Sequence, residues 1–313
     1  MVAYQTSNFQ MITMIIKCSH QIKEEVVKMQ NVKLNNGMEM PQLGFGVFQI
    51  TDLEQCKQAV LTAIKNGYRL IDTAAAYQNE TAVGAAIKES GVSREDLFIT
   101  SKLWVSDFTY DRAKKGIDTS LKNLGLDYLD MYLLHQPYGD TVGAWRALEE
   151  AQKEGKIRAI GVSNFYADQL KDLELTTNIK PVVNQIEVNP WYQQPAEVDF
   201  ANREDIRVEA WAPFAEGKHD IFTNETIAKI AKKYNKTNGQ VILRWLLQRG
   251  IVVIPKSVHE DRIKENIDVF DFELSADDMK VMSSLDKNES QFFDHRDPVT
   301  IEQIFGSSLA KLK

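Results

Sequence analysis

From Val32 onward, apolar segments of strand length alternate with amphipathic segments of helix length. The apolar segments are continuous, which is typical of strands buried on both faces of a parallel sheet. The intervening segments repeat apolar residues at helical spacing, as from Leu53 to Ile64, and end at glycines such as Gly67. This pattern predicts strands within residues 42–48, 68–74, 97–104, 128–136, 158–165, 181–188, 207–214 and 250–258.

Eight strands alternating with helices over about 250 residues predict a (β/α)8 TIM barrel. The main alternative is a doubly wound sheet, which normally carries a glycine-rich turn and a helix after its first strand. Here the segment GFGVFQ lacks the third glycine and the following helix, so the barrel is favoured. The segment VKLNNGMEMP has Asn-Gly turn chemistry and predicts a β-hairpin that caps the bottom of the barrel.

Residues 29–313 are expected to form one barrel domain, whereas residues 1–28 are interpreted as an extension, either disordered or upstream of the true start. Within that extension, the apolar run MITMIIKCSH follows no basic residues and precedes no small-residue cleavage site. It is also too short to cross a bilayer.

Composition narrows the possible partners. The formal net charge is −7 and no basic block compensates it, which argues against nucleic acid or an anionic membrane as a partner. The two cysteines form no CxxC motif, and the five histidines lack ligand spacing, so neither a disulfide framework nor a metal site is expected. No feature of the sequence requires the chain to form an oligomer. We therefore expect a cytoplasmic monomer that acts on a small molecule.

Polar residues cluster where the predicted strands end, which is where a barrel of this kind carries its site. A single polar residue at a strand end is more often structural than catalytic, but several in phase along the chain indicate a site. The residues concerned are Asp72, Lys102, His135, Ser163, Asn164, Gln185, Glu187, Trp211, Lys256 and Ser257.

Tyr77 follows the second strand and suggests proton chemistry. A free tyrosine has a pKa near 10, too high for efficient proton transfer at neutral pH, and a neighbouring ammonium lowers it. Lys102 can supply that ammonium, Asp72 can keep it charged, and His135 can orient a carbonyl oxygen. The alternative is that Tyr77 only packs at a helix start. No serine or cysteine is paired with a base, so acyl transfer is not indicated.

The motifs DTAAAY, TSKLW, LLHQP, GVSNF, NQIE and IPKSVHEDRIKEN occur in the order typical of the aldo-keto reductases. Over roughly residues 31–286 the chain resembles this family. The segment LLHQPYGDTVGAWRALEE resembles its microbial members of the diketogluconate reductase, glyoxal reductase and prostaglandin F synthase kind.

The resemblance implies an oxidoreductase that reduces aldehydes and ketones with hydride from NADPH. Tyr77 would donate the proton, Lys102 and Asp72 would tune it, and His135 would orient the carbonyl. A histidine at this position suits carbonyl reduction, whereas relatives that reduce carbon–carbon double bonds carry glutamate. The cofactor NADP(H) would be bound at its nicotinamide end by Ser163, Asn164 and Gln185, with Trp211 stacked on the ring. Core packing is the alternative role for Trp211.

The segment IPKSVHEDRIKEN brings cations to the end of the last strand. Lys256 and Ser257 end that strand, and Arg262 and Asn266 lie four residues apart, hence on one face of the next helix. A lysine, a hydroxyl and an arginine near a helix start suit a phosphate monoester. The resemblance assigns them, with Glu265, to the 2′-phosphate and adenine of NADPH. The alternative is a solvated amphipathic helix.

Aromatic residues near the strand ends predict an apolar substrate pocket made of Phe48, Trp104 and Trp191 around His135. The stretch with Phe292 and Phe293 resembles the C-terminal substrate loop of the family. The segment QPYGDTVGA is short where many animal members carry a long loop, which predicts an open pocket with relaxed specificity.

Two other classes of protein share features with this sequence. The segment YDRAK matches the YxxxK pair of short-chain dehydrogenases, but the glycine-rich turn of that class is absent. A non-catalytic sensor of pyridine nucleotides could keep the same barrel and the same site residues. A tethering extension would distinguish such a sensor, and residues 1–28 are the one candidate for it.

Overall fold

The structure is a computed structural model, and it describes residues 30–313. The strands of its main sheet are β3 (Gly44–Gly46), β4 (Leu70–Asp72), β5 (Phe98–Leu103), β6 (Leu129–Leu134), β7 (Ile157–Ser163), β8 (Val183–Glu187), β9 (Arg207–Trp211) and β10 (Val252–Val253). These eight strands are parallel and follow one another in chain order across the sheet. The extension predicted over residues 1–28 lies outside the described residues.

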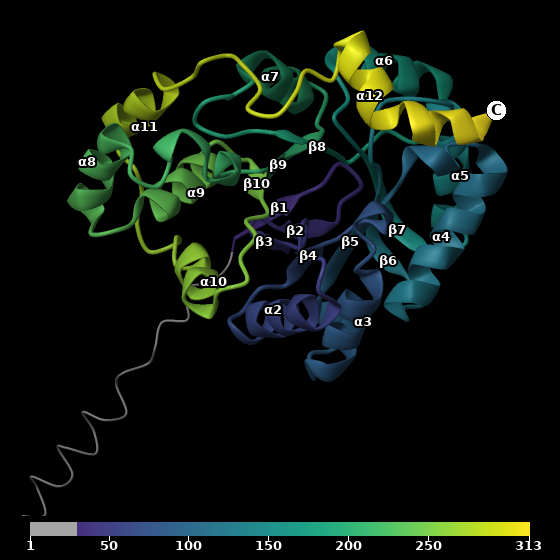
Figure 1. Cartoon of the computed structure of the whole chain (residues 1–313), viewed down its shortest axis with the longest axis horizontal. Coiled ribbons are helices and arrows are strands. Elements are labelled where there is room, and N and C mark those ends of the chain that lie inside the picture. Colours follow the sequence, from purple (N-terminus) through teal and green to yellow (C-terminus); the bar gives the residue numbers. More distant parts are fainter. Residues whose placement is uncertain (1–29) are drawn as a thin grey trace, which may run out of the picture.

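A parallel bridge between Leu43 and Val253 joins the two ends of the sheet, so the strands form a barrel surrounded by helices (Figure 1). Gly46 makes this contact sterically feasible, because a Cβ there would lie 2.9 Å from the backbone oxygen of Ile254. The eight predicted strands and the (β/α)8 fold are confirmed.

Helices follow the strands around the barrel. They are α2 (Leu53–Lys65), α3 (Glu80–Glu89), α4 (Tyr110–Leu124), α5 (Thr141–Lys153), α6 (Ala167–Thr176), α7 (Pro195–Arg203), α8 (Glu225–Tyr234), α9 (Asn238–Gln248), α10 (Glu260–Ile267), α11 (Ala276–Ser283) and α12 (Pro298–Leu309). The short 3-10 helices are η1 (Ala75–Tyr77), η2 (Arg94–Asp96), η3 (Val105–Asp107), η4 (Ala215–Asp220) and η5 (Ala310–Leu312).

Helix α2 shows how the sequence pattern becomes structure. The Asp52 side chain caps its start by accepting a hydrogen bond from the Gln55 backbone N–H at 2.7 Å. The apolar stripe from Cys56 to Ile64 is buried, whereas Leu53 at the first position remains exposed.

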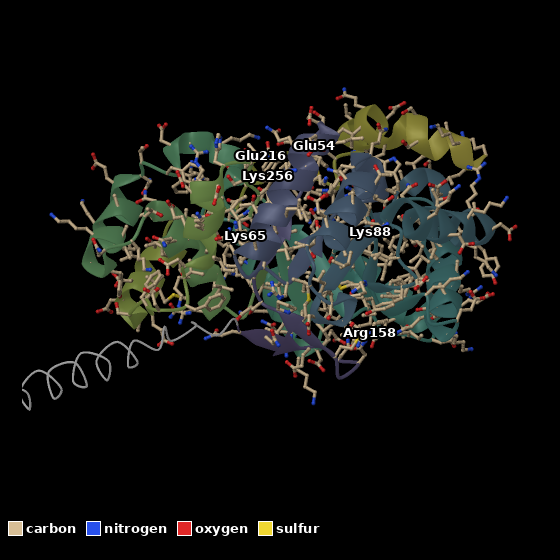
Figure 2. The ribbon with its side chains drawn as sticks, turned by 90° about the horizontal axis from the view of Figure 1, so that it is seen from below. Glu54, Lys65, Lys88, Arg158, Glu216 and Lys256 are labelled. Carbon is tan, nitrogen blue, oxygen red and sulfur yellow. The ribbon has the colours of Figure 1, made fainter. Side chains whose placement is uncertain are left out.

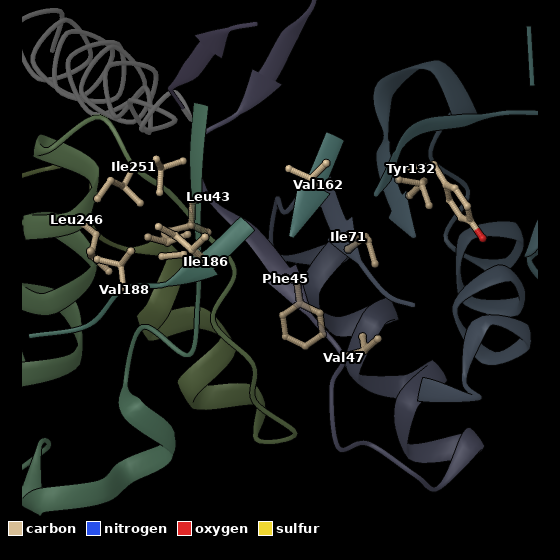
Figure 3. Packing of buried hydrophobic residues seen from close by; sticks show 14 of the residues in the cluster. Leu43, Phe45, Val47, Ile71, Tyr132, Val162, Ile186, Val188, Leu246 and Ile251 are labelled. Atoms are coloured by element: carbon tan, nitrogen blue, oxygen red, sulfur yellow. The ribbon is translucent and has the colours of Figure 1, made fainter. Parts of the chain in front are cut away.

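Side chains of the strands alternate between two apolar clusters. On β6, Met131 and Leu133 join the cluster inside the barrel, whereas Tyr132 and Leu134 pack in the layer between strands and helices. Figure 3 shows Tyr132 directed toward a neighbouring helix, and its hydroxyl lies 2.9 Å from that of Ser120 on α4. The interior is therefore a packed core, not a pore.

The bottom of the barrel is closed by the predicted hairpin. Strand β1 (Asn31–Lys33) pairs with β2 (Glu39–Pro41) in antiparallel register. Leu34 and Met40 of the hairpin complete the inner cluster. Figure 2 shows the hairpin and Arg158 at one end of the molecule, and Glu216 and Lys256 toward the opposite end.

The C-terminal segment runs over the open end as a loop followed by α12 (yellow in Figure 1). The loop was predicted, but the helix was not. Phe305 of α12 is buried, and Ser308 accepts a hydrogen bond from the Trp104 indole at 3.0 Å. Between residues 30 and 313, no helix is both long enough and apolar enough to span a membrane.

Candidate active site

The polar strand-end residues form one ring because they share the inward phase of the strands. Asp72 comes two residues after Leu70, and Gln185 two residues after Val183, both of which belong to the inner apolar cluster. His135 likewise follows Leu133. A period of two therefore places this ring one layer above the inner core, at the carboxyl ends of the strands.

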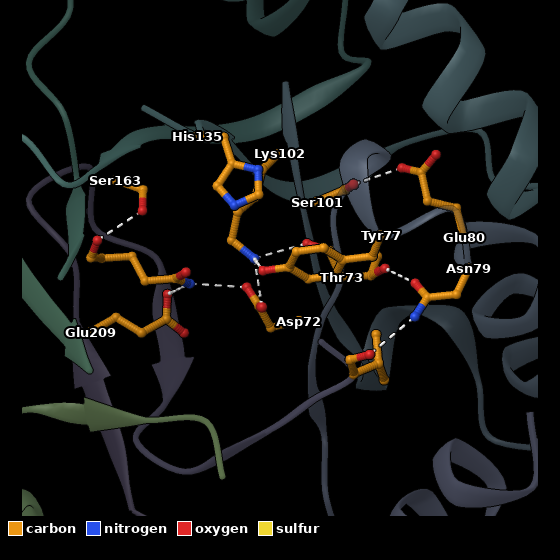
Figure 4. Close-up of polar contacts among 12 residues, drawn as sticks. Asp72, Thr73, Tyr77, Asn79, Glu80, Ser101, Lys102, His135, Ser163 and Glu209 are labelled. Atoms are coloured by element: carbon orange, nitrogen blue, oxygen red, sulfur yellow. Dashed lines mark hydrogen bonds and ion pairs between the residues drawn. The ribbon is translucent and has the colours of Figure 1, made fainter. Parts of the chain in front are cut away.

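A buried ion pair lies at the centre of the ring. Lys102 is fully buried, and its Nζ donates to Asp72 Oδ1 at 2.6 Å, to the Thr73 carbonyl at 2.9 Å and to the Tyr77 hydroxyl at 3.3 Å (Figure 4). Burial lowers the pKa of Lys102, but Asp72, Tyr77 and Glu209 together raise it more, so the net shift is upward. The lysine is therefore an ammonium at neutral pH.

Tyr77 lies in a short turn, and hydrogen bonds from a side chain of this turn fix it to the barrel. Asn79 accepts from the Thr73 hydroxyl at 2.9 Å and donates to the backbone oxygen of Val47 at 3.0 Å. The Tyr77 ring packs against Phe48, with ring centroids 4.9 Å apart. The turn therefore holds the phenol above Lys102.

The proton affinity of Tyr77 differs from the sequence-based prediction. Burial raises its pKa above the ordinary 10.0, and the attraction of Lys102 offsets this only in part. We predicted a net lowering because a sequence shows a charged neighbour but not the degree of desolvation. The phenol is therefore protonated at neutral pH, so it carries the proton that a donor must supply, and the adjacent Lys102 ammonium can stabilise the phenolate left behind.

His135 lies beside the phenol. Its ring meets those of Tyr77 and Trp104 edge-on, with centroids 5.6 Å and 5.2 Å away. Burial, and then the nearby Lys102, hold its pKa well below the ordinary 6.5, so the imidazole is neutral. Among the described residues its Nδ1 has no hydrogen-bond partner.

Neutral hydrogen-bonding groups continue the ring on β7 to β9. The Ser163 hydroxyl donates to the backbone carbonyl of Gln185 at 2.8 Å, and the Trp211 indole donates to Asn164 Oδ1 at 2.9 Å. Asn164 adopts a left-handed conformation with φ of 65°, which asparagine tolerates better than most residues and which turns the chain at the end of β7. Phe292 packs against Trp211, with centroids 5.1 Å apart.

One cavity of about 1030 Å³ connects these groups. Its lining includes Tyr77 and His135, the ring from Ser163 to Trp211, and the exposed cations Lys256 and Arg262. The ion pair on α10 joins Lys264 to Glu260 at 2.7 Å and leaves Arg262 out. A cavity of this size, lined by a phenol and by free cations, fits a phosphorylated dinucleotide together with a small substrate.

The other three residues predicted at the phosphate end lie outside this lining. Glu265 accepts from the Thr237 hydroxyl at 2.6 Å, Ser257 accepts from the His259 backbone N–H at 3.1 Å, and Asn266 is buried. Ser257 and Glu265 therefore fix the local backbone and the neighbouring helix in this structure.

Phe48 and Trp104 line the cavity as predicted, but Trp191 does not. Its ring is buried in the layer between strands and helices, with the Lys287 ammonium 5.0 Å from its centroid. In this structure Trp191 therefore lies outside the cavity lining. An aromatic residue beside a strand end can pack under a loop as readily as face the mouth.

Phe292 and Phe293, from the stretch that resembles a substrate loop, line the same cavity. His295 and Phe305, from the unpredicted part of the C-terminal segment, also line it and were missed, as was one buried acid. Glu209 of β9 is buried and accepts from Gln185 at 2.8 Å. The period of two on β9 could have revealed it, because Glu209 precedes Trp211 by two residues and shares its inward phase. Within residues 30–313, no group of three or more potential metal ligands occurs.

The mouth of this parallel barrel brings together a phenol, an ammonium and a neutral imidazole, which are groups suited to proton transfer in a barrel enzyme. A model of the aldo/keto reductase family matches residues 42–287. The glyoxal reductase of Bacillus subtilis is 52% identical over 262 residues, which covers 82% of this chain and 93% of the relative. The methylglyoxal reductase DkgA of Escherichia coli is 45% identical over 261 residues, or 82% of this chain and 94% of the relative.

Solved structures agree with these sequence matches. The crystal structure of a Bombyx mori aldo-keto reductase in complex with NADP superimposes with a TM-score of 0.81 at 36% identity, covering 88% of this chain and 97% of that one. The chain belongs to the aldo/keto reductase family.

Proposed function

We propose that this protein is an NADPH-dependent oxidoreductase that reduces small aldehydes and ketones to alcohols, with Tyr77 as the proton donor. The observation that carries the proposal is the Tyr77 hydroxyl, 3.3 Å from the buried Lys102 ammonium. This hydroxyl stands beside a neutral imidazole at the wall of the cavity.

The cavity lining suits NADP(H), which the related silkworm enzyme binds in its crystal structure. Ser163, Asn164 and Gln185 would bind the carboxamide and Trp211 would stack on the nicotinamide. Lys256 and Arg262 would bind the 2′-phosphate, with Ser257, Glu265 and Asn266 supporting that end. When bound, the cofactor supplies the hydride that the carbonyl carbon accepts.

Proton delivery follows from the positions of Tyr77, His135 and Lys102. The substrate oxygen accepts hydrogen bonds from the Tyr77 hydroxyl and from the imidazole. As the carbonyl carbon gains a hydride, its oxygen takes the Tyr77 proton and becomes the alcohol, and the O–H electron pair stays on the phenolate. The adjacent ammonium stabilises that phenolate, and Asp72 keeps the ammonium charged.

The walls indicate a small, partly apolar substrate. Phe48 packs beside Tyr77, Trp104 packs beside His135, and Phe293 and Phe305 line the same cavity. Small dicarbonyls are reasonable first substrates, because two relatives are named glyoxal and methylglyoxal reductase. The cytoplasmic location and the monomeric state stay predictions.

Loss of NADPH absorbance in the presence of small dicarbonyls, aromatic aldehydes and sugar-derived ketones tests the proposal, with NADH as the comparison. The Tyr77→Phe variant should lose turnover, because the ring remains but the transferable proton is gone. It should keep its NADPH affinity, measured by fluorescence titration. Lost NADPH binding in this variant would count against the assignment. Binding without turnover across the whole wild-type panel would favour the sensor role.

A further inference from the structure

Glu209 is a buried acid connected to the proton-donor set. Its side chain is 0% exposed, and its Oε2 accepts from Gln185 Nε2 at 2.8 Å. The same nitrogen donates to Asp72 Oδ2 at 3.0 Å, so one amide bridges two carboxyl groups (Figure 4). Glu209 Oε1 has no hydrogen-bond partner among residues 30–313.

If Asp72 and Glu209 are both ionised, the negative charges around Glu209 outnumber the positive ones. Asp72 faces it from β4, Lys102 from β5 and Tyr77 from η1. Its strand partners, Gln185 on β8 and Val252 on β10, are uncharged.

Few lysine or arginine side chains are buried in the part of the chain that the structure describes. The buried lysines and arginines in the described part of the chain are Lys102 and Arg244, and Arg244 pairs with Glu273 at 3.0 Å. Lys102 is already neutralised by Asp72 at 2.6 Å. An ionised Glu209 would therefore be a second buried anion without its own cation, which is costly.

We propose, building on the proposed function, that Glu209 is a positioning residue of this site that remains a neutral carboxylic acid and orients the Gln185 amide. Because the amide nitrogen donates to the carboxyl groups of both Asp72 and Glu209, the amide oxygen remains the acceptor available to a carboxamide in the cavity. The neutral state also leaves Lys102 and Tyr77 under the influence of one carboxylate instead of two.

Titration of Glu209 changes the acidity of Tyr77. Burial, together with Asp72, raises the pKa of Glu209 to about 8. Above that pH a second negative charge faces Tyr77 and raises the pKa of the phenol further. Since a phenol with a higher pKa gives up its proton less readily, carbonyl reduction should slow as the pH rises through the titration of Glu209.

Infrared spectra of the cofactor-free protein test the protonation state without any turnover. At neutral pH, the wild-type minus Glu209→Gln difference should contain the carbonyl stretch of a protonated carboxylic acid, which gives way to carboxylate bands at alkaline pH. The matched control is Glu149→Gln, which alters a buried acid on α5 that accepts from two backbone N–H groups at 2.7 Å. The carbonyl band assigned to protonated Glu209 must remain in the spectrum of the Glu149→Gln variant itself. Carboxylate bands from Glu209 at neutral pH would overturn the proposal.

Steady-state kinetics and cofactor binding test the positioning role. Glu209→Gln keeps an uncharged acceptor for Gln185, so its kcat should lack the alkaline decline of the wild type. Glu209→Ala removes the acceptor and should weaken NADPH binding about tenfold, the size of one lost hydrogen bond. An alkaline decline in Glu209→Gln equal to that of the wild type would refute the role. A wild type without any turnover would refute the proposed function, while the infrared result would still decide the state of Glu209.

Discussion

The two cation sites of the barrel mouth are built in opposite ways. Lys102 is 0% exposed and touches Asp72, Thr73 and Tyr77, whereas Lys256 and Arg262 are exposed and lie outside the ion pair on α10. A buried ammonium must be paired to be tolerated, so the proton-donor site is complete before any ligand arrives. Exposed cations have no such requirement, and an anionic ligand can complete their site.

The largest expected effects on stability and activity come from replacing the buried Lys102. Lys102→Met should destabilise the protein by about 3–5 kcal/mol, because it leaves Asp72 buried without its cation. It should also lower kcat by about 10²–10⁴-fold, because no ammonium stabilises the phenolate. Urea denaturation and NADPH-coupled assays measure the two effects.

The double variant Asp72→Asn with Lys102→Met sharpens this prediction. Because it removes both charges, it should recover most of the lost stability and none of the activity. A double variant as unstable as the single one would show that packing of the lysine side chain, rather than charge pairing, determines stability.

The next effect depends on pH and concerns the buried acid without a cation. The pKa of Glu209 is about 8 in the folded state against an ordinary 4.5, so the folded chain binds more protons than the unfolded chain between these values. Wild-type stability should therefore fall as pH rises through this window. Glu209→Gln lacks this loss, so its advantage should grow by up to about 1.4 kcal/mol per pH unit.

Urea denaturation at a series of pH values measures that difference. Glu149→Gln, which replaces another buried acid by its amide, is the control. Parallel curves for Glu209→Gln and the wild type would show that Glu209 is already ionised in the folded protein.

The smallest expected effect comes from replacing the exposed cations Lys256 and Arg262. Lys256→Ala and Arg262→Ala should each weaken NADPH binding by about 1.5–3 kcal/mol, because each removes a hydrogen bond to a charged group. NADH binding should be unaffected, and the free energy of unfolding should stay within about 0.5 kcal/mol of the wild type. Lys88→Ala, an exposed lysine on α3 outside the cavity lining, is the control. Equal losses for NADH and NADPH would exclude recognition of the 2′-phosphate.

The same contrast explains how much could be predicted from the sequence. The ring of polar residues at the mouth follows from strand periodicity, so Asp72, Lys102 and His135 could be identified together from the sequence. Glu209 was missed because it lies inside a strand, where a polar residue was not sought. The pKa of Tyr77 could not be predicted in sign, because desolvation depends on packing from distant segments.

Regions without periodicity were predicted less well. Trp191 has no strand phase to show which way it faces, and the structure buries it away from the cavity. Helix α12 has a weak apolar face, and its one buried residue, Phe305, leaves little pattern in the sequence. These failures concern the substrate walls, which loops and the C-terminal segment build.

The bridge between Leu43 and Val253 has a consequence for synthesis on the ribosome. The first and last barrel strands are neighbours in space, so β3 has one unpaired edge until nearly the whole barrel has been translated. Exposed strand edges invite pairing with other chains, and contacts distant in sequence form slowly. The nascent chain therefore passes through a long interval as an open sheet, during which a chaperone would protect it most.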